Sequence, residues 1–173
     1  MSDMFENDFT LTGKHATYVK YLANDAKLYK RYIDVYMNGA VFGLLHNRTA
    51  PIDKDSTDRA RIYADAFANC RMECVFLYRL VMLLGQTSNL ESPERIDRAF
   101  RDDANDSEPE KLKANLDLFN SYVRGGIEEI YEELIDGHGT TPEEYLDRAM
   151  EVMEEFRNDL RGKEPEVILE ELM

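Results

Sequence analysis

Hydrophobic residues recur at helical spacing along most of the chain. At about 100° per residue, apolar side chains gather on one stripe in several long segments, while the opposite side is polar. This pattern predicts an all-α fold, a helical bundle of about four long helices plus one or two short ones. The long helices are predicted over residues 14–46, 57–84, 108–136 and 141–161, and the short ones near 92–103 and 165–172.

The chain is long enough for one hydrophobic core, so we expect a single helical domain over residues 1–173. Residues 1–12 carry scattered apolar side chains among polar ones and predict an irregular N-terminal arm. Residues 164–173, which combine acidic and aliphatic side chains, form a candidate C-terminal docking segment that would fit the groove of another protein. Packing on the chain's own bundle is the alternative. The docking candidates are Val167, Ile168, Leu169 and Leu172.

The most apolar stretch of the sequence is Cys74–Leu84, at the end of the predicted 57–84 helix. Only Arg79 interrupts it. A helix that is apolar on every side belongs in the interior of a protein. We therefore expect this helix to be the central rod around which the other helices pack.

Arg79 is the one anomaly in this stretch. A guanidinium in a dry interior needs a carboxylate or several carbonyl groups around it. We expect a buried ion pair, for which Asp34 is a candidate partner. The alternative is that Arg79 reaches a partner or a ligand.

Two pairs of glycines interrupt the helical segments. Gly39 and Gly43 lie four residues apart, where small residues permit the close approach of another helix. Gly125 and Gly126 fall in the middle of the 108–136 stripe. That pair predicts a bend or a tight helix crossing, and the alternative is a hinge or a close approach of a ligand.

The net charge of −14 is unevenly distributed. Residues 127–173 contain 16 acidic and 4 basic side chains, a net charge of −12, whereas residues 1–126 contain 19 and 17, a net charge of −2. The acidic half is interpreted as a solvated surface, a docking surface for a basic partner, or an imitation of the phosphates of DNA.

Basic and aromatic residues alternate near the N-terminus. Basic residues among aromatic ones are typical of nucleic-acid contacts, but the acidity of the whole molecule opposes binding of a polyanion. Direct nucleic-acid binding is therefore not favoured. The residues of this basic/aromatic face are Lys20, Tyr21, Lys27, Lys30, Arg31 and Tyr32.

No pattern in the sequence indicates a catalytic site, a metal site or a cofactor. The Glu-x-x-His motif of bundle metal centres is absent, and His15, His46 and His138 are not spaced as a cluster. Neither a phosphate-binding loop nor an activated serine motif occurs. Cys70 and Cys74, on one helix face, are expected to be small buried residues.

The N-terminus is acidic and lacks the features of a signal peptide, and no apolar run is long enough to span a membrane. The sequence therefore predicts a cytoplasmic protein without membrane contact. Its favoured function is that of a non-catalytic interaction or adaptor subunit with a protein partner or a second copy of itself. The alternative is an acidic inhibitor that mimics nucleic acid, and the third class is a small-molecule- or metal-binding bundle enzyme.

Overall fold

The computed structural model describes residues 4–86, 89–104, 108–163 and 170, and it is mostly helical. The predicted docking residues Val167, Ile168, Leu169 and Leu172, and the helix expected near 165–172, lie outside the described residues. In chain order the elements are β1 (Phe9–Thr12), α1 (Gly13–Lys20), the π-helical turn η1 (Tyr21–Asp25), α2 (Tyr32–Leu45), β2 (Arg59–Ile62), α3 (Ala64–Asn69), α4 (Arg71–Leu84), α5 (Ser92–Phe100), the 3-10 turn η2 (Asp102–Ala104), α6 (Pro109–Leu134) and α7 (Pro142–Leu160).

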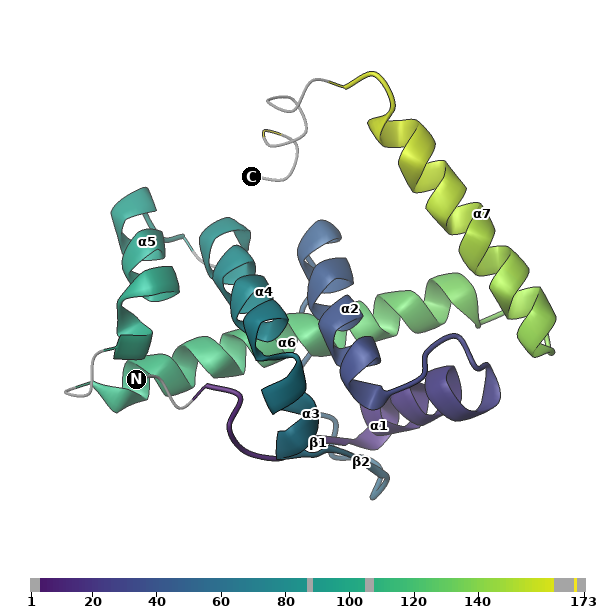
Figure 1. Ribbon diagram of the computed structural model, residues 1–173, viewed down its shortest axis with the longest axis horizontal. Coiled ribbons are helices and arrows are strands. Elements are labelled where there is room, and N and C mark those ends of the chain that lie inside the picture. The colour runs from purple at the N-terminus through teal and green to yellow at the C-terminus, as the bar shows by residue number, and fades with distance from the viewer. Residues whose placement is uncertain (1–3, 87–88, 105–107, 164–169, 171–173) are drawn as a thin grey trace.

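The long helix α6 is the axis of the molecule. It runs the length of the molecule, with α2, α4 and α5 rising from one side and α1, β1 and β2 on the other (Figure 1). Its inner face buries Phe119, Tyr122, Val123, Ile127 and Ile130. The helices predicted over 108–136 and 141–161 are confirmed by α6 and α7, and α5 with η2 confirms the one near 92–103.

The expectation of a continuous central helix over residues 57–84 is wrong. The segment begins as strand β2, continues as the short helix α3, and turns at Cys70 into α4. Only one face of α4 is buried, by Cys74, Tyr78, Val81 and Met82. Its other face carries Met72 and Phe76 into solvent, because no described element packs over them.

The predicted 14–46 helix is wrong as well, because it is two helices with a connection between them. α1 loosens into the π-helical turn η1, and Lys27 adopts a positive φ of 56°, which a helix cannot continue through. The new helix α2 begins where the Asp34 carboxylate accepts a hydrogen bond of 3.1 Å from the backbone N–H of Arg31.

Part of the arm expected to be irregular is a strand. β1 pairs antiparallel with β2, with Phe9 opposite Ile62 and Leu11 opposite Ala60. In β2 the burial alternates from residue to residue, which places Ala60 and Ile62 on the core side. The strand pair covers one side of α1 and anchors the N-terminal segment.

α2 crosses α6 at backbone contact distance through the glycines. A Cβ on Gly39 would lie 2.8 Å from the Val123 carbonyl oxygen, and one on Gly126 would overlap the carbonyl of Gly39. Gly43 and Gly125 are closed in by backbone atoms in the same way. The tight crossing predicted for both glycine pairs is confirmed, and α6 passes through Gly125 and Gly126 as a continuous helix.

The crossing predicts a large effect of a single methyl group. We expect Gly126→Ala to lower the free energy of unfolding by more than about 3 kcal/mol, because backbone must move to admit the new Cβ. The control is Gly137→Ala, where no atom of the described residues lies within 4 Å of the added Cβ and the strain comes from the positive φ of 76°. Gly137→Ala should lower the free energy of unfolding by about 1–2 kcal/mol. Urea unfolding measures both variants, and an equal decrease in the free energy of unfolding for Gly126→Ala and Gly137→Ala would contradict the backbone contact.

Candidate functional site

Charged side chains from three parts of the chain meet where α1 and the end of α2 reach α6. The Glu128 carboxylate contacts Lys14 Nζ at 2.8 Å, His15 Nε2 at 2.9 Å and Arg48 Nη2 at 2.8 Å. Arg48 also bridges to Glu129 and Glu132, at 2.8 and 2.6 Å. The basic N-terminal part and the acidic C-terminal part of the sequence therefore meet within one chain, in what we call the ionic cluster.

The electrostatics of the cluster follow from burial and from the neighbouring charges. Burial raises the pKa of Glu128, but hydrogen bonds from Lys14, His15 and Arg48 outweigh it, so the pKa lies below its ordinary value. Burial lowers the pKa of His15, although the bond to Glu128 opposes the shift. His15 is thus neutral at pH 7, with its proton on Nε2 facing the carboxylate.

The geometry of the cluster is that of structural ion pairing. Each carboxylate is bound by Arg48, and His15 Nδ1 is buried with no hydrogen-bond partner among the described residues. Within the same residues, no group of three or more His, Cys, Asp or Glu side chains is placed to hold a metal ion. The expectations of no enzyme activity and no cofactor stay predictions.

The two cysteines are buried thiols, as predicted. Burial raises the pKa of Cys74 to about 12. The thiol is therefore protonated at neutral pH, whereas a nucleophilic cysteine acts as its thiolate.

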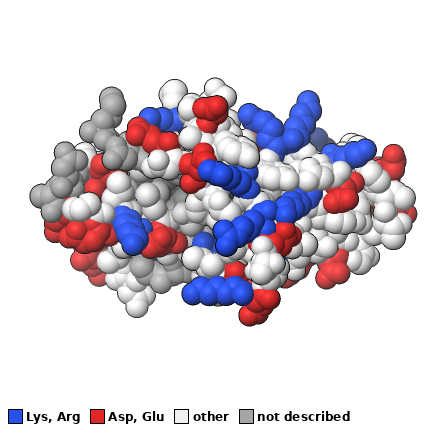
Figure 2. Space-filling model, turned by 90° about the horizontal axis from the view of Figure 1, so that it is seen from below, with Lys and Arg blue, Asp and Glu red and all other residues white. Residues whose placement is uncertain are grey.

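The structure gives several members of the basic/aromatic face a partner in the chain itself. Lys20 pairs with Asp58, and Arg31 pairs with Asp34. The Tyr21 hydroxyl bonds that of Tyr145 at 2.8 Å, and Tyr32 accepts a hydrogen bond from Asn24. Lys27 and Lys30 are exposed. On the side that carries the strands, Lys and Arg side chains are mixed with Asp and Glu (Figure 2).

Arg79 is neither deeply buried nor paired with Asp34, which corrects the predicted ion pair. Its side chain is 40% exposed, and its closest carboxylate contact is with Asp103, at 3.9 Å. The guanidinium stacks over the Phe100 ring at 5.2 Å, while Nε finds no hydrogen-bond acceptor among the described residues. The reason is the open outer face of α4, which lets Arg79 reach the edge of a surface groove.

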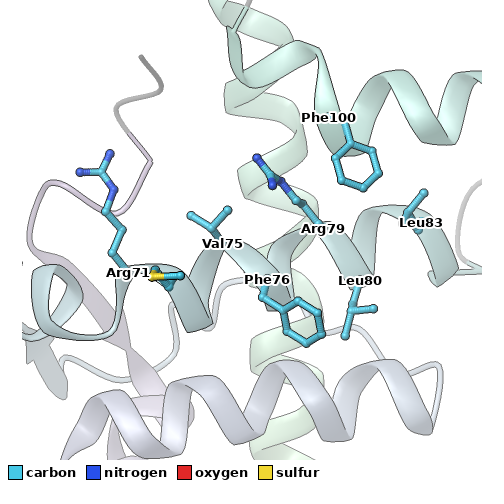
Figure 3. A pocket seen from close by; sticks show the side chains of 8 residues that line it. Arg71, Val75, Phe76, Arg79, Leu80, Leu83 and Phe100 are labelled. Atoms are coloured by element: carbon cyan, nitrogen blue, oxygen red, sulfur yellow. The ribbon is translucent and has the colours of Figure 1, made fainter.

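This groove runs along α4 beside α5 and has a volume of about 530 Å³. Met72 is 84% exposed and Phe76 61% exposed, unusually high for apolar side chains in a helix. Phe100 of α5 faces Arg79 across the groove, and Arg71 lies toward its other end (Figure 3). We call it the α4 groove. Its lining residues are Arg71, Met72, Val75, Phe76, Arg79, Leu80, Leu83 and Phe100.

A smaller apolar hollow of about 240 Å³ lies between α2 and α4. Leu80 lines both this hollow and the α4 groove, so the two form one apolar surface. Val41 and Leu45 of α2 extend that surface. Apart from Arg71 and Arg79, the residues that line it are apolar, which suits the docking of an apolar side of a protein better than the binding of a polar small molecule.

The second uncovered apolar surface is on α7. The beginning of this helix is fixed to α6: Tyr145 is buried, and Arg148 Nε donates a 3.1 Å hydrogen bond to the carbonyl of Glu133. The stripe predicted to be buried is instead mostly in solvent, and Met153 is 70% exposed. We call this the α7 stripe. It consists of Leu146, Met150, Met153 and Phe156.

Sequence reasoning missed the α4 groove because α4 is apolar nearly all round. Periodicity does not distinguish the outward Phe76 from the buried Tyr78 two residues later. Arg79 was the available signal, since a charged residue in an apolar helix marks either an internal pair or an edge that meets solvent.

The ionic cluster predicts that the folded protein loses stability as the pH falls, already at pH values above those at which carboxylates titrate. Folded His15 has a pKa below its ordinary value of 6.5, so protons bind the unfolded chain preferentially as the pH falls below that value. Between about pH 7.5 and pH 5.5 the stability lost through His15 is at most about 1.4 kcal/mol, the limit reached if the folded imidazole stays neutral throughout. In His15→Gln this part of the pH dependence should disappear, whereas the exposed-site control His138→Gln should retain it. Urea unfolding at both pH values measures the difference, and an unchanged dependence in His15→Gln would be evidence against a buried neutral His15.

Comparison of the chain with protein-family models, with curated proteins and with solved structures found no match. In the part of the chain that the structure describes, none of the helices has both the length and the apolar character to cross a membrane.

Proposed function

We propose that the protein is a non-catalytic interaction subunit of a larger cytoplasmic assembly, and that it binds through the apolar surface on α4 and α5. The observation that carries this proposal is the contiguous exposure of apolar side chains along the α4 groove, of which Met72 and Phe76 are the most exposed. Single exposed apolar residues are ordinary, whereas a contiguous patch of this kind is typical of a protein-binding surface.

The shape and charge of the α4 groove fit an amphipathic helix. A helix lying in a groove presents apolar side chains at intervals of three and four residues. Arg71 and Arg79 line the groove, and Arg71 is paired with Glu6 at 2.7 Å. Acidic residues beside the apolar stripe of the incoming helix would therefore be favoured near Arg79. The apolar contact supplies affinity, and the charges select the partner and its orientation.

The mimicry of nucleic acid is the weaker proposal. Three of the carboxylates that would imitate phosphates, Glu128, Glu129 and Glu132, are bound to Arg48 within the chain. Carboxylates on α7 remain exposed, but they flank an apolar stripe, which a phosphate array does not have. A bundle enzyme is the weakest proposal, because the grooves are lined mainly by apolar side chains.

A photo-crosslinking residue at position 76 tests the interaction proposal. We expect a p-benzoylphenylalanine in place of Phe76 to form protein adducts in the cells that make the protein. The matched control is the same residue in place of Tyr63, an aromatic residue that is also 61% exposed but lies next to β2, away from the groove. Adduct formation at position 76 no greater than at position 63 would contradict a binding role for the groove.

A further inference from the structure

We infer that the helix bound in the α4 groove is α7 of a second copy of this chain. In the resulting dimer each copy lays its own α7 in the groove of the other, an arrangement that we call the exchange. This inference depends on the proposed function, because it names the partner of the same groove. It is carried by the match between the α7 stripe and the α4 groove in length, in apolar character and in charge.

The two surfaces have the same length. From Leu146 to Phe156 the α7 stripe spans about 15 Å, at 1.5 Å per helical residue. From Met72 to Leu83 the α4 groove spans about 16 Å on the same basis. The spacing of the stripe, 146, 150, 153 and 156, is the three- and four-residue spacing by which a helix places side chains into a groove.

The charges beside the two surfaces are opposite. Asp147, Glu151 and Glu154 follow three of the stripe residues along α7 and form an acidic row beside the stripe. Within α7, Glu151 contacts Arg148 at 3.4 Å and Glu154 contacts Arg157, whereas Asp147 makes no ion pair among the described residues. Two arginines line the groove, and Arg71 is already paired with Glu6 at 2.7 Å. The Arg79 guanidinium has its nearest carboxylate among the described residues, that of Asp103, only at 3.9 Å, so Arg79 is the cation that an incoming carboxylate would meet. Laying the helix in the groove brings the acidic row to Arg79, while the apolar side chains leave water.

The helix that fills the groove belongs to another molecule because of where α7 is attached. α5 and α7 lie over opposite ends of α6 (Figure 1). The first turns of α7 are held at the C-terminal end of α6 by buried Tyr145 and by Arg148. A helix fixed in this way cannot lie beside α5 of its own chain, but a second copy has no such restriction.

Exchange around a two-fold axis would use both surfaces of both chains. A closed dimer of this type contains the α7–groove contact twice, so the area removed from water doubles. It also leaves neither apolar surface exposed. A one-way contact would instead leave a free stripe at one end and a free groove at the other, and would continue into a filament.

Charge reversal on the two surfaces tests the exchange. We expect the purified full-length protein to be a dimer by sedimentation and light scattering. Arg79→Glu alone and the pair Asp147→Lys and Glu154→Lys alone should each raise the dissociation constant by about tenfold or more, because like charges then face each other in both contacts. Mixing the two variants should restore the dimer, since every contact in the mixed dimer pairs opposite charges.

The controls separate the exchange from other effects. Arg59→Glu, an exposed reversal on β2 away from the groove, should leave the dissociation constant unchanged. Thermal unfolding by circular dichroism establishes that each variant is folded, which is expected because Arg79, Asp147 and Glu154 are at least partly exposed.

The outcomes are distinguishable from those of the proposed function. A monomeric wild-type protein, or a mixture of variants that remains monomeric, overturns the exchange. If the residue at position 76 still crosslinks to a different protein in that case, the groove binds another partner and the proposed function stands. A dimer unaffected by either reversal also overturns the exchange, and places the contact elsewhere on the molecule. Absence of both dimer and crosslinks overturns both proposals.

Discussion

The contact of backbone with backbone where α2 crosses α6 determines the positions of most other elements. Gly39 and Gly43 on one helix and Gly125 and Gly126 on the other let the two backbones touch. The same approach brings the chain after α2 against α6, since a Cβ on Gly125 would overlap the carbonyl of Arg48. Arg48 is thereby held beside the next turns of α6, where Glu128, Glu129 and Glu132 lie. The ionic cluster is thus a consequence of the crossing.

The close crossing also explains why α4 is covered on one side only. α4 packs against α2 and α6 through Cys74, Tyr78, Val81 and Met82, which fill the core beside Phe119. Because α2 and α6 are in direct contact, α4 packs beside this pair of helices and not between them. α5 covers one edge of α4 and leaves the groove that contains Phe76 and Arg79. An apolar surface that no described element covers remains after the core is complete.

Local sequence predicted the elements that depend on local signals. α6 and α7 follow from single amphipathic stripes, and α7 begins where Thr141 accepts a hydrogen bond from the N–H of Glu144. The breaks in the other two long helices depend on distant contacts, because β2 is a strand through its pairing with β1 about fifty residues earlier. The positive φ of Lys27 has no sequence signal, since lysine is not a residue that favours it. The candidate site escaped prediction because exposure of Phe76 depends on which neighbours α4 has.

The acidic residues of the C-terminal half have two different physical roles, and amino-acid composition alone does not distinguish them. On α6 the carboxylates bind Arg48, Lys14 and His15, so most of their charge is neutralised inside the fold. On α7 they lie in solvent beside Leu146, Met150 and Met153. An exposed apolar stripe without such charges would associate with many surfaces. Carboxylates along its edge make contacts with other acidic surfaces unfavourable. On α7 the charge would therefore restrict the partners of the apolar stripe to surfaces that offer a cation, as the α4 groove offers Arg79.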